Sequence, residues 1–311
     1  MDELAEPLAA LLGAGGVTDV TRLSGGASRE TFRFVADGRP LILQRQRAGD
    51  VRDMGLEALV LRAAAAGGVP VPELIADSTD ASALGSAYMV LAAVDGETIA
   101  RKILRDDLYA PARAALPAQL GAAMAQLHTI DTAGLESLPA TDQVQQYRDV
   151  LDQVAQPHPT FELVFRWLHA NRPAPRPPVL VHGDFRLGNV IVGPEGLRAV
   201  LDWELAHLGD PMEDLGWLCV KAWRFGSPLP VAGVGRYEQL FEAYEAAGGG
   251  AVDPDVVRWW EVLGTLKWGI MCIMQANAHV AGFTRSHELA AIGRRVCENE
   301  HDLFLALEGR W

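Results

Sequence analysis

The sequence predicts an α+β protein of two lobes: a small β-rich N-terminal lobe with one main helix, and a larger, mostly helical C-terminal lobe. Strand-like segments gather before residue 93, whereas helical spacing of apolar residues dominates after residue 98. A chain of 311 residues is long enough for two such units. We therefore assign residues 1–92 to the N-terminal lobe, 93–97 to a hinge or linker and 98–311 to the C-terminal lobe.

The N-terminal lobe starts with leucines at helical spacing, which predict a short amphipathic helix. After this helix, strand-like runs alternate with turn signals. Asp37-Gly38 is a hairpin signal, because both residue types tolerate the positive φ that a tight turn requires. The strands predicted around this hairpin are residues 20–23, 31–36 and 40–46.

A helix follows the hairpin, and two further strands complete the lobe. Asp53 is a residue type that caps helix N-termini, and apolar residues at helical spacing continue to about Ala66. Gly67-Gly68 ends this helix, and the VPVPE segment that follows favours extended backbone. We expect the last two strands near residues 74–76 and 88–92.

The C-terminal lobe is predicted to consist of helices interrupted by one group of short strands. A proline-rich break, ANRPAPRPPV, precedes that group. We expect helices at 116–130, within 141–155, and at 160–171, 211–222, 234–247, 254–277 and 286–307. The short strands are expected at 179–181, 189–192 and 197–201.

Composition and missing motifs exclude several classes of protein. With 27 basic and 40 acidic residues, the formal net charge is −13, which opposes general binding to nucleic acid or to anionic membranes. No apolar run of about twenty residues occurs, so we expect no membrane span. Three widely spaced cysteines fit no disulfide framework, and we expect a reducing, cytoplasmic environment. Walker A, GxGxxG, HExxH and GxSxG motifs are absent from the sequence.

One segment, residues 179–211, carries the chemistry. The tripeptide HGD ends at Asp184, Asn189 lies five residues further on, and Asp202 follows a second short strand. A tight hairpin brings Asp202 beside Asn189, and carboxylate and amide oxygens are ligands that suit Mg²⁺. Asp184 can accept a proton from a substrate hydroxyl. A base, two metal ligands and a nearby cation are the components of a phosphoryl-transfer site.

The order H-x-D-x-x-x-x-N followed by a strand and Asp matches the catalytic and metal loops of protein kinases. The stretch HGDFRLGNVIV…LDWELAHLGDPMEDLGWLC, with WE where protein kinases have FG, resembles the aminoglycoside phosphotransferase and choline kinase superfamily. In particular it resembles phosphotransferase family proteins, whose relatives include kinase domains associated with acyl-CoA dehydrogenases. The resemblance covers nearly the whole chain. It implies a protein-kinase-like fold, ATP and Mg²⁺ as cofactors, and a small-molecule hydroxyl as the acceptor.

The same resemblance implies a role for each residue of the segment. Asp184 is expected to orient or deprotonate the acceptor hydroxyl, and Asn189 and Asp202 are expected to bind Mg²⁺. Arg186 takes the place of the catalytic-loop lysine of kinases and should stabilise charge on the transferred phosphoryl group. Three other residues are expected to assist: Glu204 near the metal, Asp214 as an acceptor for backbone N–H groups of the HGD loop, and His182 as an orienting group.

The N-terminal lobe is expected to supply the nucleotide site. Glycines in the loop between the first two strands let backbone N–H groups approach phosphates. Glu57 lies in the helix where the family places the glutamate that anchors the phosphate-binding cation. The remaining expected nucleotide contacts are Ser24, Gly25, Gly26 and Ser28 in the loop, and Met89 and Leu91 at the hinge beside adenine.

The strand at 40–46 departs from the kinase pattern, because the N-terminal lobe contains no lysine. Kinases hold the α- and β-phosphates with a lysine on this strand. Our alignment places Gln44 at the lysine position and Arg45 next to it, and only one of them can face the nucleotide because side chains alternate along a strand. We favour Arg45, paired with Glu57, because arginine can bind phosphate bidentately.

Three functions stay open at this point. An aminoglycoside kinase needs an acidic cleft, for which the candidates are Asp142, Asp149, Asp152 and Glu162. A hydroxyacyl-CoA kinase needs cations for the CoA phosphates, for which the candidates are Arg166, Arg172 and Arg176. A nucleotide-binding pseudokinase is the third; the missing lysine favours it, and the complete set of Asp184, Asn189 and Asp202 opposes it.

Overall fold

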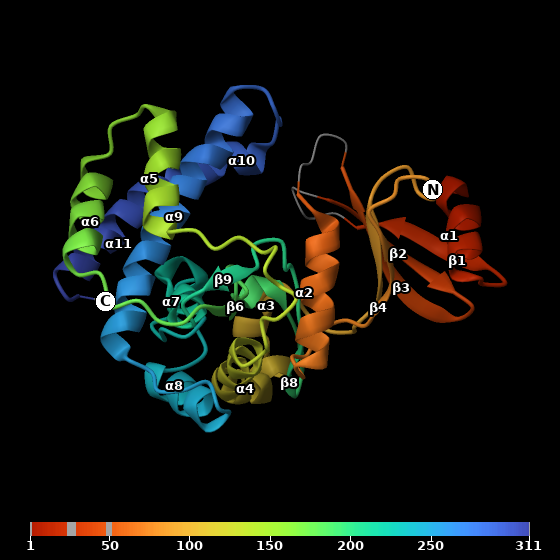
Figure 1. The fold of residues 1–311 in the computed structure, drawn as a ribbon, viewed down its shortest axis with the longest axis horizontal. Helices are drawn as coiled ribbons and strands as arrows, with labels where there is room; N and C mark the ends of the chain where they lie inside the picture. Colours follow the sequence, from red (N-terminus) through yellow and green to blue (C-terminus); the bar gives the residue numbers. More distant parts are fainter. Residues whose placement is uncertain (1, 24–28, 48–51, 311) are drawn as a thin grey trace.

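A β-sheet built from the N-terminal part of the chain lies beside a larger helical part, and helix α2 (Met54–Ala66) stands between them (Figure 1). The structure is a computed structural model that describes residues 2–23, 29–47 and 52–310. The predicted α+β class, with a small β-rich lobe and a larger helical lobe, is confirmed.

The sheet has five strands, and each strand is antiparallel to its neighbours. They are β1 (Val17–Arg22), β2 (Arg29–Ala36), β3 (Arg39–Gln46), β4 (Leu74–Ser78) and β5 (Tyr88–Ala92). Their order across the sheet is β1-β2-β3-β5-β4. Asp37 and Gly38 turn the chain between β2 and β3 with φ values of 48° and 81°, as their residue types predict.

The two faces of the sheet bury different side chains. On one face, Phe34 and Leu43 pack with Leu8 of helix α1 (Ala5–Leu12). On the other face, Met89 packs with Met54 of α2. A strand residue therefore points either toward α1 or toward α2, and the α2 side is the side that adjoins the helical part (Figure 1).

Helix α2 begins and ends where the sequence predicts. The Asp53 carboxylate accepts hydrogen bonds from the N–H groups of Gly55 and Leu56 at 2.8 and 3.3 Å, which satisfies two free donors of the first turn. Gly67 is the residue that follows the last turn. Val60 and Leu61 pack into the core of the helical part, so α2 joins the two parts of the molecule.

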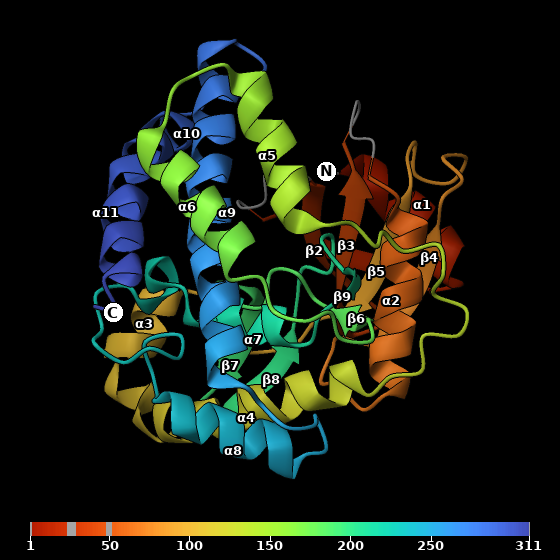
Figure 2. The ribbon, with the colours of Figure 1, turned by 60° about the vertical axis from the view of Figure 1, so that its left-hand side comes forward.

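The helical part contains nine α-helices among the described residues. They are α3 (Ala100–Arg105), α4 (Ala110–His128), α5 (Gln143–Val154), α6 (Pro159–Ala170), α7 (Met212–Cys219), α8 (Tyr237–Ala246), α9 (Pro254–Val280), α10 (His287–Ile292) and α11 (Val296–Leu307). Figure 2 shows the long α9 with α5, α6, α10 and α11 beside it. None of the described helices is both long and apolar enough to cross a membrane.

Two pairs of short strands sit within the helical part. Strand β6 (Val179–Val181) pairs with β9 (His207–Gly209), and β7 (Val190–Gly193) pairs with β8 (Gly196–Val200). Three of these strands lie where the sequence predicts them, whereas the three-residue β9 is too short to produce a pattern. The HGD tripeptide leaves β6, and Asp202 follows closely on β8, so the strand pairs hold the catalytic segment at both ends.

Helix α4 begins at Ala110 rather than at the predicted Leu116, and it contains Pro117. A proline removes one helical hydrogen bond and normally marks a helix boundary. Here its ring packs so closely on Gly235 that an added Cβ at that glycine would overlap the ring. Tertiary packing therefore retains a proline that the sequence pattern alone places near the helix start.

Candidate active site

The HGD loop turns sharply where it leaves β6. Gly183 has a φ of 76°, a conformation that side-chain-bearing residues rarely adopt. A Cβ at this position would also overlap the carbonyl oxygen of Leu205. Glycine is therefore required here, and the turn directs the side chain of the next residue, Asp184, away from β6.

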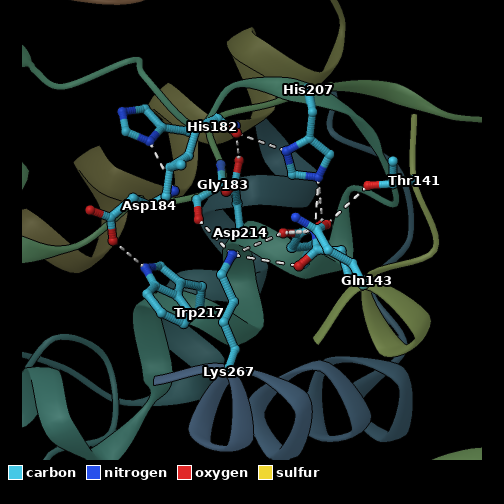
Figure 3. A network of polar contacts seen from close by, with 12 residues as sticks. Thr141, Gln143, His182, Gly183, Asp184, His207, Asp214, Trp217 and Lys267 are labelled. Atoms are coloured by element: carbon cyan, nitrogen blue, oxygen red, sulfur yellow. Dashed lines mark hydrogen bonds and ion pairs between the residues drawn. The ribbon is translucent and has the colours of Figure 1, made fainter. Parts of the chain in front are cut away.

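Three N–H donors hold the Asp184 carboxylate. Trp217 Nε1 donates to Oδ1 at 2.8 Å, Arg186 Nε donates to the same oxygen at 3.0 Å, and Asn189 Nδ2 donates to Oδ2 at 2.6 Å. Figure 3 shows the Trp217 contact from α7. An ionised carboxylate has about four acceptor positions. The side chain is thus fixed in one orientation. Oδ2 accepts from Asn189 and only shares the Arg186 N–H, at 3.2 Å, so it is the oxygen that can also accept from a substrate hydroxyl.

The backbone of the HGD loop is held by Asp214 of α7. Its carboxylate accepts hydrogen bonds from the N–H groups of His182 and Gly183 at 2.7 and 2.9 Å, and His128 Nε2 lies 3.1 Å away. Burial alone raises the pKa of Asp214, but His128, His182 and the backbone N–H groups outweigh it and lower the pKa to about 2. Asp214 braces the loop, as predicted.

His182 is an orienting residue, as the sequence indicates. The N–H of Asp184 donates to His182 Nδ1 at 3.2 Å, so Nε2 carries the proton and donates to the carbonyl of Leu201 at 2.9 Å. The side chain is completely buried, and burial lowers its pKa. A neutral imidazole therefore ties the HGD loop to the end of β8.

The β7–β8 hairpin brings the two expected metal ligands together. The N–H of Leu201 donates to the backbone carbonyl of Asn189 at 2.8 Å, and Asp202 comes directly after Leu201. Asn189 Nδ2 donates its hydrogen bonds to Asp184. The side-chain carbonyl oxygen of Asn189 is therefore the atom that can bind a metal. Asp202 itself has a φ of 65°, so the backbone turns sharply where the carboxylate is presented.

The chemistry of this donor set fits Mg²⁺. Within residues 29–47 and 52–310, no donor hydrogen-bonds to the Asp202 carboxylate, and no cluster of three His, Cys, Asp or Glu side chains could hold a metal. Burial and the nearby Glu204 and Asp184 carboxylates raise the pKa of Asp202 to about 7. Mg²⁺ is commonly bound by one or two protein oxygens together with substrate phosphates and water, so Asp202 and Asn189 suffice.

The unpartnered carboxylate has a measurable consequence for stability. We expect Asp202→Asn to raise the free energy of unfolding of the metal-free chain at pH 8 by at least about 1 kcal/mol, because it removes a largely buried negative charge among other carboxylates. Urea denaturation of the two proteins without metal checks this. Asp302→Asn removes a carboxylate paired with Lys221 and should not stabilise. An unchanged or lower stability of Asp202→Asn would contradict the interpretation of Asp202 as a destabilising charge.

Arg186 lies beside Asp184 with its guanidinium over an indole. Its Cζ is 5.0 Å from the centre of the Trp223 ring, and Nε is used by Asp184. No described residue accepts a hydrogen bond from its two terminal nitrogens. These nitrogens are the part of the side chain that can meet phosphoryl oxygens.

The structure corrects the predicted partner of Glu57. Arg45 points to the α1 side of the sheet, where Nη2 pairs with Glu30 at 2.6 Å and Nη1 donates to the carbonyl of Leu84 at 3.1 Å. Glu57, on the α2 side, instead pairs with Arg29 of β2, whose Nη1 lies 2.6 Å from Glu57 Oε1. The prediction that Arg45 pairs with Glu57 is wrong because strand alternation turns residue 45 away from α2.

The other expected nucleotide contacts fall in two groups. Met89 and Leu91 are both buried on the α2 side of β5, the side that adjoins the helical part. Ser24, Gly25, Gly26 and Ser28 lie outside the described residues.

A buried lysine that the sequence analysis did not single out supports the site from α9. Lys267 Nζ donates to the carbonyl of Gly183 at 3.1 Å and lies 4.6 Å from the centre of the Trp217 ring (Figure 3). It also lies 3.8 Å from Glu213, to which Gln143 donates a hydrogen bond. Burial alone lowers the pKa of Lys267, but neighbouring groups, Glu213 and Asp184 among them, raise it. The charged amine thus holds both the HGD loop and the tryptophan that contacts Asp184.

One signal for this lysine exists in the sequence. Lys267 is one of only three lysines in the chain, and it interrupts an otherwise apolar helical stretch. A charged residue in such a stretch is almost never buried unless it is paired. Trp217 gives no comparable signal, because a tryptophan on a helix is usually a packing residue.

The contact between Trp217 and Asp184 can be tested separately from packing. We expect Trp217→Phe to lower turnover by roughly 10-fold or more, because a hydrogen bond to a charged group contributes about 1.5–3 kcal/mol. Trp167→Phe is the matched control, since Trp167 packs in a cluster of side chains from α5, α6, α9 and α11 that includes neither Trp217 nor Asp184. Steady-state turnover and melting temperature are measured for both. Equal turnover in the two variants would contradict a role for the Trp217 N–H.

The residues proposed for acceptor recognition are mostly engaged elsewhere. Asp142 caps α5 and pairs with Arg172 at 2.6 Å, and Asp152 and Glu162 both pair with Arg148. These three carboxylates therefore form ion pairs with neighbouring arginines of the chain. Arg172 also lines, together with Arg176 and Trp259, a cavity of about 350 Å³ between the proline-rich segment and α9.

Comparisons with known proteins identify a family and several solved structures of the same fold. The model of a family described as the phosphotransferase enzyme family matches residues 19–260. Mouse acyl-CoA dehydrogenase family member 10 is 29% identical over 249 residues, which are 74% of this chain and 23% of the mouse protein. Chicken acyl-CoA dehydrogenase family member 11 is 30% identical over 65% of this chain and 28% of that protein. The chain thus spans about a quarter of the length of these relatives.

Solved structures share the fold over almost the entire chain. A Ralstonia eutropha JMP134 protein, provisionally named an aminoglycoside phosphotransferase, has a TM-score of 0.78 at 22% identity and covers 98% of each chain. Spectinomycin phosphotransferase, solved with ADP and spectinomycin, has a TM-score of 0.66 at 13% identity, with 97% of this chain and 98% of that chain covered. The two-lobed, kinase-like architecture is therefore shared.

Proposed function

The chain belongs to the phosphotransferase enzyme family, and from that premise we propose that it transfers the γ-phosphoryl group of ATP to a hydroxyl of a small molecule in a Mg²⁺-dependent reaction. The observation that carries the proposal is the Asp184 carboxylate, which three donors hold beside Asn189 and next to the hairpin that presents Asp202. A fixed base beside oxygen ligands for a metal is the arrangement that phosphoryl transfer requires.

The chain's own residues account for the proton and the charge. The acceptor hydroxyl would donate a hydrogen bond to Asp184 and lose its proton to that carboxylate as the oxygen attacks the γ-phosphorus and the bond to ADP breaks. The terminal nitrogens of Arg186 would bind the transferred oxygens. Bound at Asn189 and Asp202, Mg²⁺ would neutralise phosphate charge.

The nucleotide would lie between the two parts of the molecule. Met89 and Leu91 of β5 would contact adenine, and the phosphates would lie toward Asp202. Spectinomycin phosphotransferase shares the fold and was solved with ADP, which supports nucleotide binding by this chain.

A hydroxyacyl-CoA is the second candidate acceptor. The relatives named as acyl-CoA dehydrogenase family members favour it, although this chain matches only about a quarter of their length. Arg176, beside the cavity described above, is a cation that a CoA phosphate could use, whereas Arg172 is paired with Asp142. The engaged acidic residues of α5 and α6 weigh against a polycationic aminoglycoside.

A pseudokinase does not transfer a phosphoryl group, so it does not require a carboxylate fixed in one orientation as Asp184 is. Three donors converge on this carboxylate, and Lys267 and Asp214 support the loop behind it. We therefore infer an enzyme rather than a regulatory nucleotide-binding module.

Melting temperatures with ATP alone, Mg²⁺ alone and both together test the proposal. A ligand at 100 times its Kd stabilises the folded state by about 2.7 kcal/mol. We expect a shift that requires nucleotide and metal together, and a further shift on adding the correct acceptor from a panel of aminoglycosides, choline and hydroxyacyl-CoAs. No shift at millimolar ATP and Mg²⁺ would overturn the proposal.

A further inference from the structure

The strand that carries the phosphate-binding lysine in kinases has a neutral residue at that position here. Gln44 of β3 lies opposite Thr31 of β2 and Met89 of β5. Because Met89 packs against α2, Gln44 faces the same side. The nucleotide side of β3 therefore offers an amide where a cation is expected.

A cation from the neighbouring strand occupies this place. Arg29, in the first position of β2, lies on the same side, and its Nη1 donates to Gln44 Oε1 at 3.1 Å. The same guanidinium donates hydrogen bonds to the Glu57 carboxylate of α2 from both terminal nitrogens, Nη1 to Oε1 at 2.6 Å and Nη2 to Oε2. The positive charge thus sits at the end of the Gln44 side chain, where the amine of a lysine on β3 would lie.

These contacts leave one edge of the guanidinium available. Nη1 uses its two hydrogens on Gln44 and Glu57, and Nη2 uses one on Glu57. Among the residues that the structure describes, none accepts a hydrogen bond from Arg29 Nε. The Nε–H and the second Nη2–H form a parallel pair of donors, which matches two oxygens of a phosphate.

The surroundings connect Arg29 to the metal loop. Glu204 Oε2 lies 3.6 Å from Arg29 Nη2 and 2.7 Å from Arg52 Nη1, and Glu204 follows Asp202 by two residues. Arg29 and Glu57 side chains are each only 7% exposed. A buried ion pair contributes little net stability, so its position beside the metal loop calls for another role.

We infer that Arg29, supplied by β2 instead of β3, is the cation that binds the nucleotide's phosphates, and that Glu57 and Gln44 hold its guanidinium in place. The inference rests on the proposed function. Arg29 is the first residue of β2, so it would contact the phosphates from the start of that strand. A lysine at position 44 of β3 is then unnecessary, and Gln44 can occupy that position.

Calorimetric titration of the full chain with ATP in the presence of Mg²⁺ tests this inference. We expect Arg29→Leu to weaken binding by roughly 10-fold or more, and Arg33→Leu, an exposed arginine on the same strand, to change it less than about twofold. Arg29→Leu leaves the Glu57 carboxylate buried without its cation, which could weaken binding indirectly. The double variant Arg29→Leu/Glu57→Leu removes this unpaired charge, and its affinity for ATP should fall by the same factor as that of Arg29→Leu. Melting temperatures without ligand confirm that each variant is folded.

A variant that moves the positive charge from position 29 of β2 to position 44 of β3 tests the inference in the opposite direction. We expect Arg29→Leu/Gln44→Lys to regain most of the lost affinity, because the introduced lysine can reach Glu57 from the adjacent strand. If this variant is folded and binds no better than Arg29→Leu, the inference is overturned. It is also overturned if Arg29→Leu/Glu57→Leu binds as tightly as the wild type, or if Arg45→Leu is the variant that loses affinity. An absence of binding by the wild type itself would instead refute the proposed function.

Discussion

Replacing Asp184 by asparagine should lower turnover by roughly 10³-fold while leaving nucleotide binding within about twofold, because removal of a positioned base typically costs 10² to 10⁴ in rate. Asparagine has almost the same shape, but it cannot take the acceptor's proton. Its side chain also offers one oxygen where Trp217, Arg186 and Asn189 now share two.

The measurement is acceptor-dependent ADP release at saturating ATP, with binding followed by calorimetry. Asp107→Asn is the matched control, since that carboxylate is exposed in the helical part near α3. Equal residual ATP hydrolysis in the wild type and Asp184→Asn would contradict the catalytic assignment.

The largest loss of stability is expected for Asp214→Ala, at about 3–5 kcal/mol, because removing a buried charged partner leaves its donors unsatisfied. The N–H groups of His182 and Gly183 and the ring of His128 would all lose their acceptor in a fully buried place. Asp149→Ala, on the exposed face of α5, is the control and should change the free energy of unfolding by less than about 0.5 kcal/mol.

The pH dependence of this difference follows from the pKa of Asp214. That pKa falls from an ordinary 3.8 to about 2 on folding, so the stabilisation is present above pH 4 and is lost as the pH falls toward 2. The stability gap between wild type and Asp214→Ala should therefore narrow over this range in urea denaturation curves. A gap that stays constant from pH 7 to pH 2 would contradict the role given to the ionised carboxylate.

The catalytic segment could be predicted because its information is local. The spacing from Asp184 to Asn189, the turn before β8 and the position of Asp202 all lie within twenty residues, and a hairpin between two short strands can place them in only one way. The cap at Asp53 and the turn at Asp37-Gly38 are local in the same sense.

The remaining parts of the site depend on long-range packing. Whether residue 44 or residue 45 faces α2 depends on which of the alternating side chains of β3 point toward that helix in the folded sheet. No pattern in the sequence indicates that Arg29 of β2 pairs with Glu57 of α2. Likewise, Lys267 meets Gly183 across 84 positions of sequence, because α9 passes beside the HGD loop. Such contacts are properties of the folded arrangement.

The central claim is that this chain forms a phosphate ester on a small-molecule hydroxyl through Asp184. Mass spectrometry of an acceptor incubated with the enzyme, ATP and Mg²⁺ tests it most directly. We expect one acceptor to gain a single phosphoryl group on a hydroxyl with the wild type, and none to do so with Asp184→Asn. ATP consumed only to ADP and inorganic phosphate, at the same rate by both proteins and with no modified acceptor, would contradict the claim.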